Sequence, residues 1–198
     1  VMGDSSLRPQ WFATMLMLAL TGAVTGRYVD FTQAQHAALR MVAERSGLSV
    51  SDAGADQIVG AMRRLPPHPD VSGGLEELAA AGLRLVALTN SVLDAAEEQL
   101  TSAGIRQRFE AVYSADEVRR LKPAPEPYRM VAERSGVPIE QTWLVAAHAW
   151  DISGALAAGC RAAFVARPGM VPSAVGPQPD LIVADIAELA ERLPASIS

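Results

Sequence analysis

Residues 83–91 read LRLVALTNS, and this stretch indicates the fold. Five of its first six residues are apolar, which is typical of a strand that is buried on both faces of a parallel sheet. The stretch ends at the polar residues Thr89 and Asn90, and sites in open α/β sheets lie at such carboxyl ends of strands. The sequence therefore predicts that Thr89 and Asn90 form the floor of a site. The alternative is that Asn90 or Ser91 only caps the helix that follows.

The rest of the chain divides into two parts on either side of a proline-rich segment, residues 65–69. Helical patterns alone precede this segment, at residues 11–24, 32–46 and 52–64. Helix and strand patterns alternate after it, with strands expected at residues 83–88, 111–114, 143–147, 162–166 and 181–183, and helices at 72–81, 92–103, 126–135 and 152–158. Such alternation is typical of a doubly wound, parallel, Rossmann-like α/β sheet. We therefore predict a helical domain over residues 1–68 and a core domain over residues 69–198.

Composition limits the function classes. The formal net charge of -5 speaks against nucleic acid as the main partner, because no basic stripe is present to neutralise phosphates. The single cysteine, Cys160, permits no internal disulfide and is consistent with a cytoplasmic protein. The uncharged run at residues 9–26 contains threonines and glycines, and its densely apolar part is shorter than a bilayer requires. We expect a buried helix there rather than a membrane span.

Three polar residues follow later strand patterns and carry the candidate chemistry. Lys122 lies in RLKPAPEPY, where two prolines stiffen the backbone beside it, and His148 and Asp151 lie in WLVAAHAWD. Each has a structural alternative: Lys122 as a solvated charge, Asp151 as the N-cap of helix 152–158, and His148 as a hydrogen-bonded core histidine. Their common location at strand ends favours a site.

These segments also carry a family resemblance. LTNS, KPAPEPY and VAAHAWDISGA, in this order and at this spacing, resemble the later motifs of the haloacid dehalogenase superfamily. Together with GRYVDF at residues 26–31, the set resembles in particular the type II (S)-2-haloacid dehalogenases. The resemblance implies that residues 1–68 form a helical cap over the Rossmann-like core. It also implies the homodimer that is common in this family.

The resemblance implies a hydrolase that converts a small 2-haloacid to the 2-hydroxy acid without a metal or cofactor. An aspartate attacks the carbon that bears the halogen, and water then hydrolyses the resulting ester. Thr89 and Asn90 match the polar step that holds the substrate carboxylate and helps to receive the halide. Lys122 matches the lysine that keeps the nucleophile ionised, and Asp151 matches the acid that anchors this lysine and the hydrolytic water.

The remaining matches form the walls of the substrate pocket. Tyr128 matches a tyrosine behind the catalytic lysine, and Phe31 and Trp150 match apolar walls. Two positions depart from the family pattern, because Phe12 stands where an arginine receives the halide and His148 stands where the family has asparagine. We therefore expect the halide to depend on Asn90, His148 and aromatic edges, with Phe12 as part of the roof.

The first motif of the family, a strand that ends in DxxxT, is not found in this sequence. Asp4 and Asp30 follow no hydrophobic strand, so neither is expected to be the nucleophile. We expect that the first strand of the sheet is missing from this sequence and that the chain, taken literally, is inactive.

Two alternatives remain. A phosphatase of the same superfamily would hold Mg²⁺ through acidic residues after the fourth strand, but the matching pair here is Ala146 and Ala147, and only Asp151 remains. A non-catalytic protein could use the apolar helix 11–24 to associate with a partner.

Overall fold

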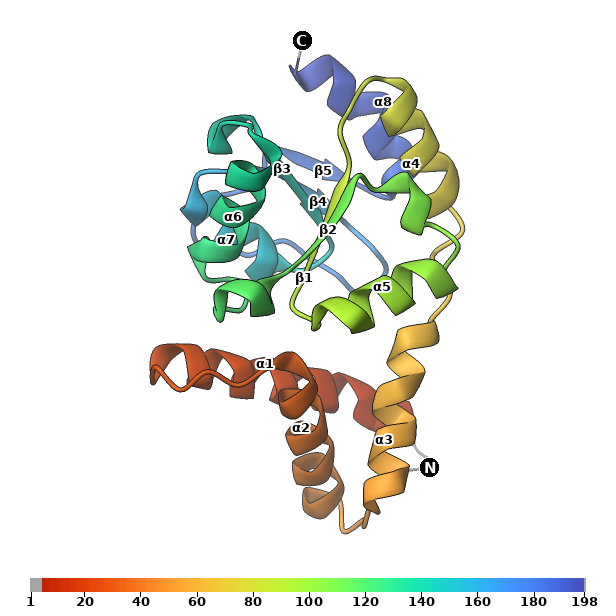
Figure 1. The fold of residues 1–198 in the computed structure, drawn as a ribbon, viewed down its shortest axis with the longest axis vertical. Coiled ribbons are helices and arrows are strands. Elements are labelled where there is room, and N and C mark those ends of the chain that lie inside the picture. Colours follow the sequence, from red (N-terminus) through yellow and green to blue (C-terminus); the bar gives the residue numbers. More distant parts are fainter. Residues whose placement is uncertain (1–4, 198) are drawn as a thin grey trace.

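The computed structural model describes residues 5–197, which form a helical region and an α/β region (Figure 1). The helical region lies below the α/β region in Figure 1, and the chain passes from one to the other after residue 64. Asp4 lies outside the described residues.

The described part of the helical region consists of three α-helices, α1 (Arg8–Val24), α2 (Phe31–Arg45) and α3 (Asp52–Ala61), and two short 3₁₀ helices, Ser5–Leu7 and Met62–Arg64. Their apolar faces meet in one cluster, in which Leu39 and Val42 are fully buried. Asp30 is the N-cap of α2, and its side chain accepts a hydrogen bond from the backbone N–H of Gln33 at 2.9 Å. This carboxylate therefore serves the helix end, in agreement with its exclusion as a nucleophile.

The α/β region alternates strands and helices as predicted: α4 (Val71–Ala80), β1 (Val86–Thr89), α5 (Leu93–Ser102), β2 (Ala111–Ser114), α6 (Pro125–Ser135), β3 (Trp143–Ala146), α7 (Ala149–Ala158), β4 (Arg161–Val165), β5 (Leu181–Val183) and α8 (Ile186–Ile197). All strand pairs are parallel. In Figure 1, α6 and α7 lie on one face of the strands and α4 and α8 on the other. This is the doubly wound arrangement that the alternating pattern predicts.

Strand β4 shows how the sequence produces these two layers. Successive side chains of a strand point to opposite faces. Phe164 packs with Ile152 of α7, while its neighbour Val165 packs with Leu189 of α8. All residues of the strand from the second onward are buried, because a central parallel strand is covered on both sides.

The strands form two separate sheets, with the orders β1-β2 and β3-β4-β5. Within the described residues, β1 pairs only with β2, and the edge of β3 away from β4 is unpaired. A cavity of about 1060 Å³ lies between these two edges, and its walls include residues 86–88 of β1 and 143–146 of β3. The prediction of a strand from residue 83 that is buried on both faces is therefore wrong in part. The strand begins at Val86, and its side chains are only half-buried because they line this cavity.

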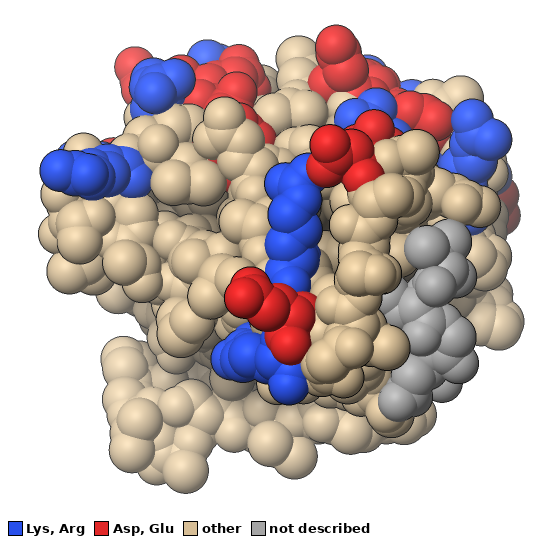
Figure 2. All heavy atoms as spheres, turned by 90° about the horizontal axis from the view of Figure 1, so that it is seen from below, with Lys and Arg blue, Asp and Glu red and all other residues tan. Residues whose placement is uncertain are grey.

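No helix in the described part of the chain is both long enough and apolar enough to span a bilayer. Helix α1 carries no charged residue after Arg8, and its side chains Met17, Leu20 and Val24 are exposed. Figure 2, which views the molecule from the side of the helical region, shows wide areas without charge between scattered charged side chains.

Candidate active site

A buried ion pair lies at the carboxyl ends of β1 and β3. The Lys122 ammonium donates to Asp151 Oδ2 at 2.7 Å and to the Leu88 carbonyl oxygen at 3.1 Å. The side chains of Lys122 and Asp151 are only 8% and 6% exposed. The alternative that Lys122 is a solvated surface charge is therefore wrong. Each charge of such a buried pair needs the other close by, because a buried charge without a partner would strongly destabilise the folded protein.

Asn90 holds the backbone of Lys122 in place. Asn90 Nδ2 donates to the Lys122 carbonyl oxygen at 3.2 Å, and Asn90 Oδ1 accepts from the Lys122 N–H at 2.8 Å. The alternative that Asn90 or Ser91 caps the next helix is wrong, because α5 starts at Leu93 with Val92 as its N-cap and no side-chain capping bond. Thr89 Oγ1 accepts from the backbone N–H of Ser91 at 3.1 Å and thereby fixes the turn after β1.

Tyr128 completes the surroundings of Asp151 from the other side. Its hydroxyl donates to Asp151 Oδ1 at 2.6 Å and lies 3.1 Å from the Asp151 carbonyl oxygen. Burial, reinforced by the nearby Asp151 carboxylate, raises the pKa of Tyr128 far above its usual value, so this residue acts as a neutral donor. Gly154 makes the arrangement possible, because a Cβ at this position would lie 2.5 Å from Pro123 Cβ and 2.7 Å from the Tyr128 hydroxyl.

Helix α7 presents Asp151 from its first turn. The sequence suggested a helix from residue 152 with Asp151 as its possible N-cap, but the helix begins at Ala149 and His148 is the N-cap residue. Asp151 is thus the third residue of the helix, and the N-cap alternative is wrong. The carboxylate is free to meet Lys122 because it caps nothing.

Three rings form a stack where the helical region meets this site. The ring centroids of Phe12 in α1 and His148 are 5.2 Å apart, and those of His148 and Trp150 are 5.6 Å apart. The Lys122 ammonium lies 6.0 Å from the Trp150 ring centroid. Burial lowers the pKa of His148 below its usual value. The nearby Asp151 carboxylate opposes this shift, and the Lys122 ammonium adds to it. The imidazole is therefore neutral at pH 7.

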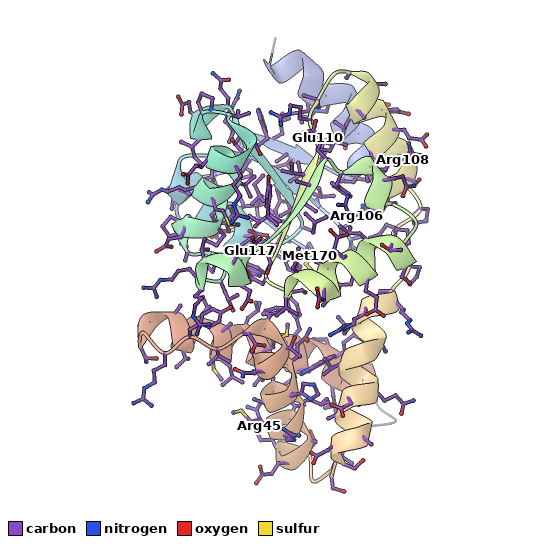
Figure 3. All side chains as sticks on the ribbon, in the orientation of Figure 1. Arg45, Arg106, Arg108, Glu110, Glu117 and Met170 are labelled. Atoms are coloured by element: carbon purple, nitrogen blue, oxygen red, sulfur yellow. The ribbon has the colours of Figure 1, made fainter. Side chains whose placement is uncertain are left out.

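Phe31 lies at the same boundary. Like Phe12 it packs against the core cluster of the helical region, and it also packs against the cluster that contains buried Ala115 and Leu121. It thus borders the residue before Lys122. Tyr28 belongs to this cluster too, and its hydroxyl donates to Asp116 Oδ1 while the Arg119 guanidinium lies 4.4 Å from its ring centroid. Figure 3 shows side chains filling this boundary, where the labelled Glu117 belongs to the same short helix as Asp116, residues 115–118.

Tyr28 was not singled out from the sequence. Its segment, GRYVDF, stood out as an aromatic turn between two helices, and that was the available signal.

Among the described residues, no three His, Cys, Asp or Glu side chains gather as metal ligands would. The cavity between the sheets reaches the site, since Lys122 and Tyr128 are part of its lining.

A family description of haloacid dehalogenase-like hydrolases matches residues 12–159. The chain belongs to this family. Haloacetate dehalogenase H-2 from Moraxella sp. (strain B) is 30% identical over 173 residues, which are 87% of this chain and 77% of that protein. The (S)-2-haloacid dehalogenase of Pseudomonas fluorescens is 29% identical over 195 residues, which are 98% of this chain and 86% of that protein.

Solved structures extend the likeness to the fold. The structure of L-2-haloacid dehalogenase from Xanthobacter autotrophicus with covalently bound chloropropionic acid has a TM-score of 0.88 and 26% identity. It covers 97% of this chain and 91% of that chain. This haloacid dehalogenase-like chain therefore has the fold of the L-2-haloacid dehalogenases. The site brings Asn90, Lys122, Asp151 and Tyr128 into direct contact, whereas the catalytic roles assigned to them stay predictions.

Proposed function

We propose that this chain, together with a strand that carries the nucleophile, forms an enzyme that hydrolyses small 2-haloalkanoic acids to 2-hydroxy acids through an aspartyl ester. The observation that carries the proposal is the buried Lys122 ammonium, which Asp151 and the Leu88 carbonyl oxygen hold in the wall of the cavity. The names of relatives support the substrate class, since they are haloacetate and (S)-2-haloacid dehalogenases.

The nucleophile of this proposal is an aspartate on a strand that lies between β1 and β3. Two facing edges without a partner among the described residues, with a cavity of about 1060 Å³ between them, provide the space and backbone groups for such a strand. An ammonium has three N–H donors, and Lys122 uses two of them within the described chain. The third would stabilise a carboxylate at the end of the added strand and keep it ionised.

The reaction proceeds in two balanced steps. A carboxylate oxygen of the nucleophile attacks the carbon that bears the halogen, a carbon–oxygen bond forms, and the halide leaves with the electrons of the carbon–halogen bond. Water, oriented by Asp151, then adds to the ester carbonyl. The bond between the acyl carbon and the substrate oxygen breaks, one proton of the water passes to that oxygen, and the other leaves to solvent. This regenerates the aspartate carboxylate and releases the 2-hydroxy acid.

The helical region acts as a cap in this proposal. Phe12 and Trp150 both stack on His148 near the ion pair, and Phe31 lies beside Leu121, the residue before Lys122. A cap of this kind excludes water and strengthens the electrostatic interactions within the site. The predicted homodimer remains part of the proposal, and the exposed apolar side chains of α1 support it.

The test compares residues 1–198 with the same chain extended at Val1 by the first strand of the Xanthobacter autotrophicus enzyme. We expect the extended protein to release chloride from 2-chloropropionate with and without EDTA, and an aspartate-to-asparagine change in the added strand to abolish this release. Hydrolysis of p-nitrophenyl phosphate that requires Mg²⁺, without chloride release, would favour the phosphatase instead. Absence of both activities in the folded, extended protein would contradict any hydrolytic function.

A further inference from the structure

The Lys122–Asp151 ion pair does not compensate the negative charge of a bound substrate. Lys122 and Asp151 are both buried and together carry no net charge. A 2-haloacid brings one carboxylate charge into this pocket when it binds. In the first step the negative charge of the aspartate passes to the halide, so the pocket then holds the halide and the substrate carboxylate, which the ion pair does not compensate. Uncompensated charge in a poorly solvated site is costly, which means that another group must supply a positive charge.

The arginines of the helical region do not supply this charge. Arg27 is exposed, Arg40 pairs with Asp52, and Arg63 and Arg64 pair with Glu98. Helix α1, which provides Phe12, carries Arg8 as its only charged residue, and that side chain is exposed. Arg45 of α2 donates to Thr14 Oγ1 at 2.9 Å, and Figure 3 shows it in the lower part of the helical region, away from the boundary with the α/β region. Arg119, on the α/β side, lies over the ring of Tyr28 in a different cluster. Lys122 and Asp151 are the charged groups that act on His148.

His148 is a titratable ring in a suitable place. It is the N-cap of α7, yet its side chain makes no capping hydrogen bond. Its ring lies within 5.6 Å of two aromatic ring centroids, those of Phe12 and Trp150. Ring faces attract cations at about 6 Å or less, so this stack favours an imidazolium once burial is offset by a nearby anion.

A donor without a partner among the described residues lies beside His148. The indole Nε1 of Trp150 is buried and has no hydrogen-bond partner among the described residues. Most buried N–H groups in proteins are satisfied, so an unsatisfied one next to a titratable ring indicates a place for an acceptor. The Lys122 ammonium also lies 6.0 Å from the Trp150 ring centroid, so positive potential already reaches this place.

We infer that His148 is the charge-compensating residue of this site and takes up one proton when a monovalent anion, a halide or a substrate carboxylate, binds beside Trp150. The inference rests on the proposed function for the nature of the anion. The empty site holds a neutral imidazole, and the occupied site holds an imidazolium between two ring faces. Anion binding and proton uptake are then reciprocal, so each strengthens the other.

The test follows the imidazole of His148 by NMR in residues 1–198, with bromide as the probe at constant ionic strength. The chain contains 3 histidines, so the signal that disappears in His148→Gln identifies the residue. We expect saturating bromide to raise the pKa of this ring by about one unit or more. His36, whose Nε2 lies 3.6 Å from Asp56 Oδ1 in the helical region, provides the internal control, and its NMR signal should not respond to bromide.

Bromide affinity gives the second readout. One coupled proton makes affinity fall as pH rises through the two pKa values of the free and the occupied ring. For a pKa rise of one unit the slope is about threefold per pH unit at its steepest, and the total fall is about tenfold. We expect this slope in the unaltered chain and in His36→Gln, and a pH-independent, weaker affinity in His148→Gln. A bromide-insensitive pKa of His148, or an unchanged slope in His148→Gln, would overturn the inference.

The outcomes separate this inference from the proposed function. A bromide-dependent pKa of His148 without chloride release by the extended enzyme would support the anion site and contradict the dehalogenase. Chloride release by the extended enzyme without any response of the His148 pKa to bromide would support the dehalogenase and contradict proton uptake by His148.

Discussion

The two sides of the candidate site are built differently. On the α/β side, Lys122, Asp151, Tyr128 and Asn90 are buried and hydrogen-bonded to one another. On the helical side, Phe12 contributes ring contacts alone, at 5.2 Å from the His148 ring centroid. Hydrogen-bonded charges fix distances tightly, whereas ring contacts tolerate substitution of similar volume. The α/β side therefore sets the geometry for the chemistry, and the helical side can change its residues while the site persists.

Removal of the lysine should have the largest effect. Lys122→Met leaves Asp151 buried without its partner, so we expect the free energy of unfolding to fall by about 3–5 kcal/mol in urea denaturation. The double variant Lys122→Met/Asp151→Leu should recover much of this loss, because no buried charge remains. Arg40→Met removes a pair in which the side chains are 53% and 87% exposed, and it should cost less than about 1 kcal/mol. Equal losses in Lys122→Met and Arg40→Met would show that the buried pair is not special.

An added methyl group at Gly154 should have an intermediate effect. Gly154→Ala places a Cβ 2.5 Å from Pro123 Cβ, so α7 must move away from the segment that carries Lys122. We expect a loss of about 1–3 kcal/mol in the same denaturation experiment. Gly60→Ala in α3 is the matched control, since its Cβ meets nothing within 4 Å and should add up to about 1 kcal/mol. The close approach is refuted if both variants gain stability.

The smallest effect is expected on the helical side. Phe12→Leu keeps an apolar side chain, so its effect on unfolding should stay below about 1.5 kcal/mol. It removes one ring face from His148, however, and should lower the bromide-bound pKa of this residue by about 0.5–1 unit. Phe31→Leu is the control, because Phe31 packs against Leu121 and outside the ring stack. A similar change of the bromide-bound His148 pKa in Phe12→Leu and Phe31→Leu would show that the Phe12 ring does not specifically stabilise the imidazolium.

The resemblance placed both departures from the family pattern, Phe12 and His148, in the substrate pocket. It did not predict that these two residues stack on each other. Phe12 belongs to the first helix and His148 follows the third strand, so their contact depends on how the helical region packs against the α/β region. Local sequence patterns contain no information about such a contact.

The sequence by itself determined the order and type of the elements. Strands β2 and β5 begin and end where their apolar runs predict, and the helices agree within about three residues, because periodicity, glycine and proline act locally. It also predicted that the polar residues after β1 and β3 meet. Only the tertiary structure decided that Asn90 binds the backbone of Lys122, that Asp151 lies inside the first turn of α7, and that the strands form two sheets with a cavity between them. These features depend on which edges and side chains pack together over long sequence separations, and no local pattern specifies that packing.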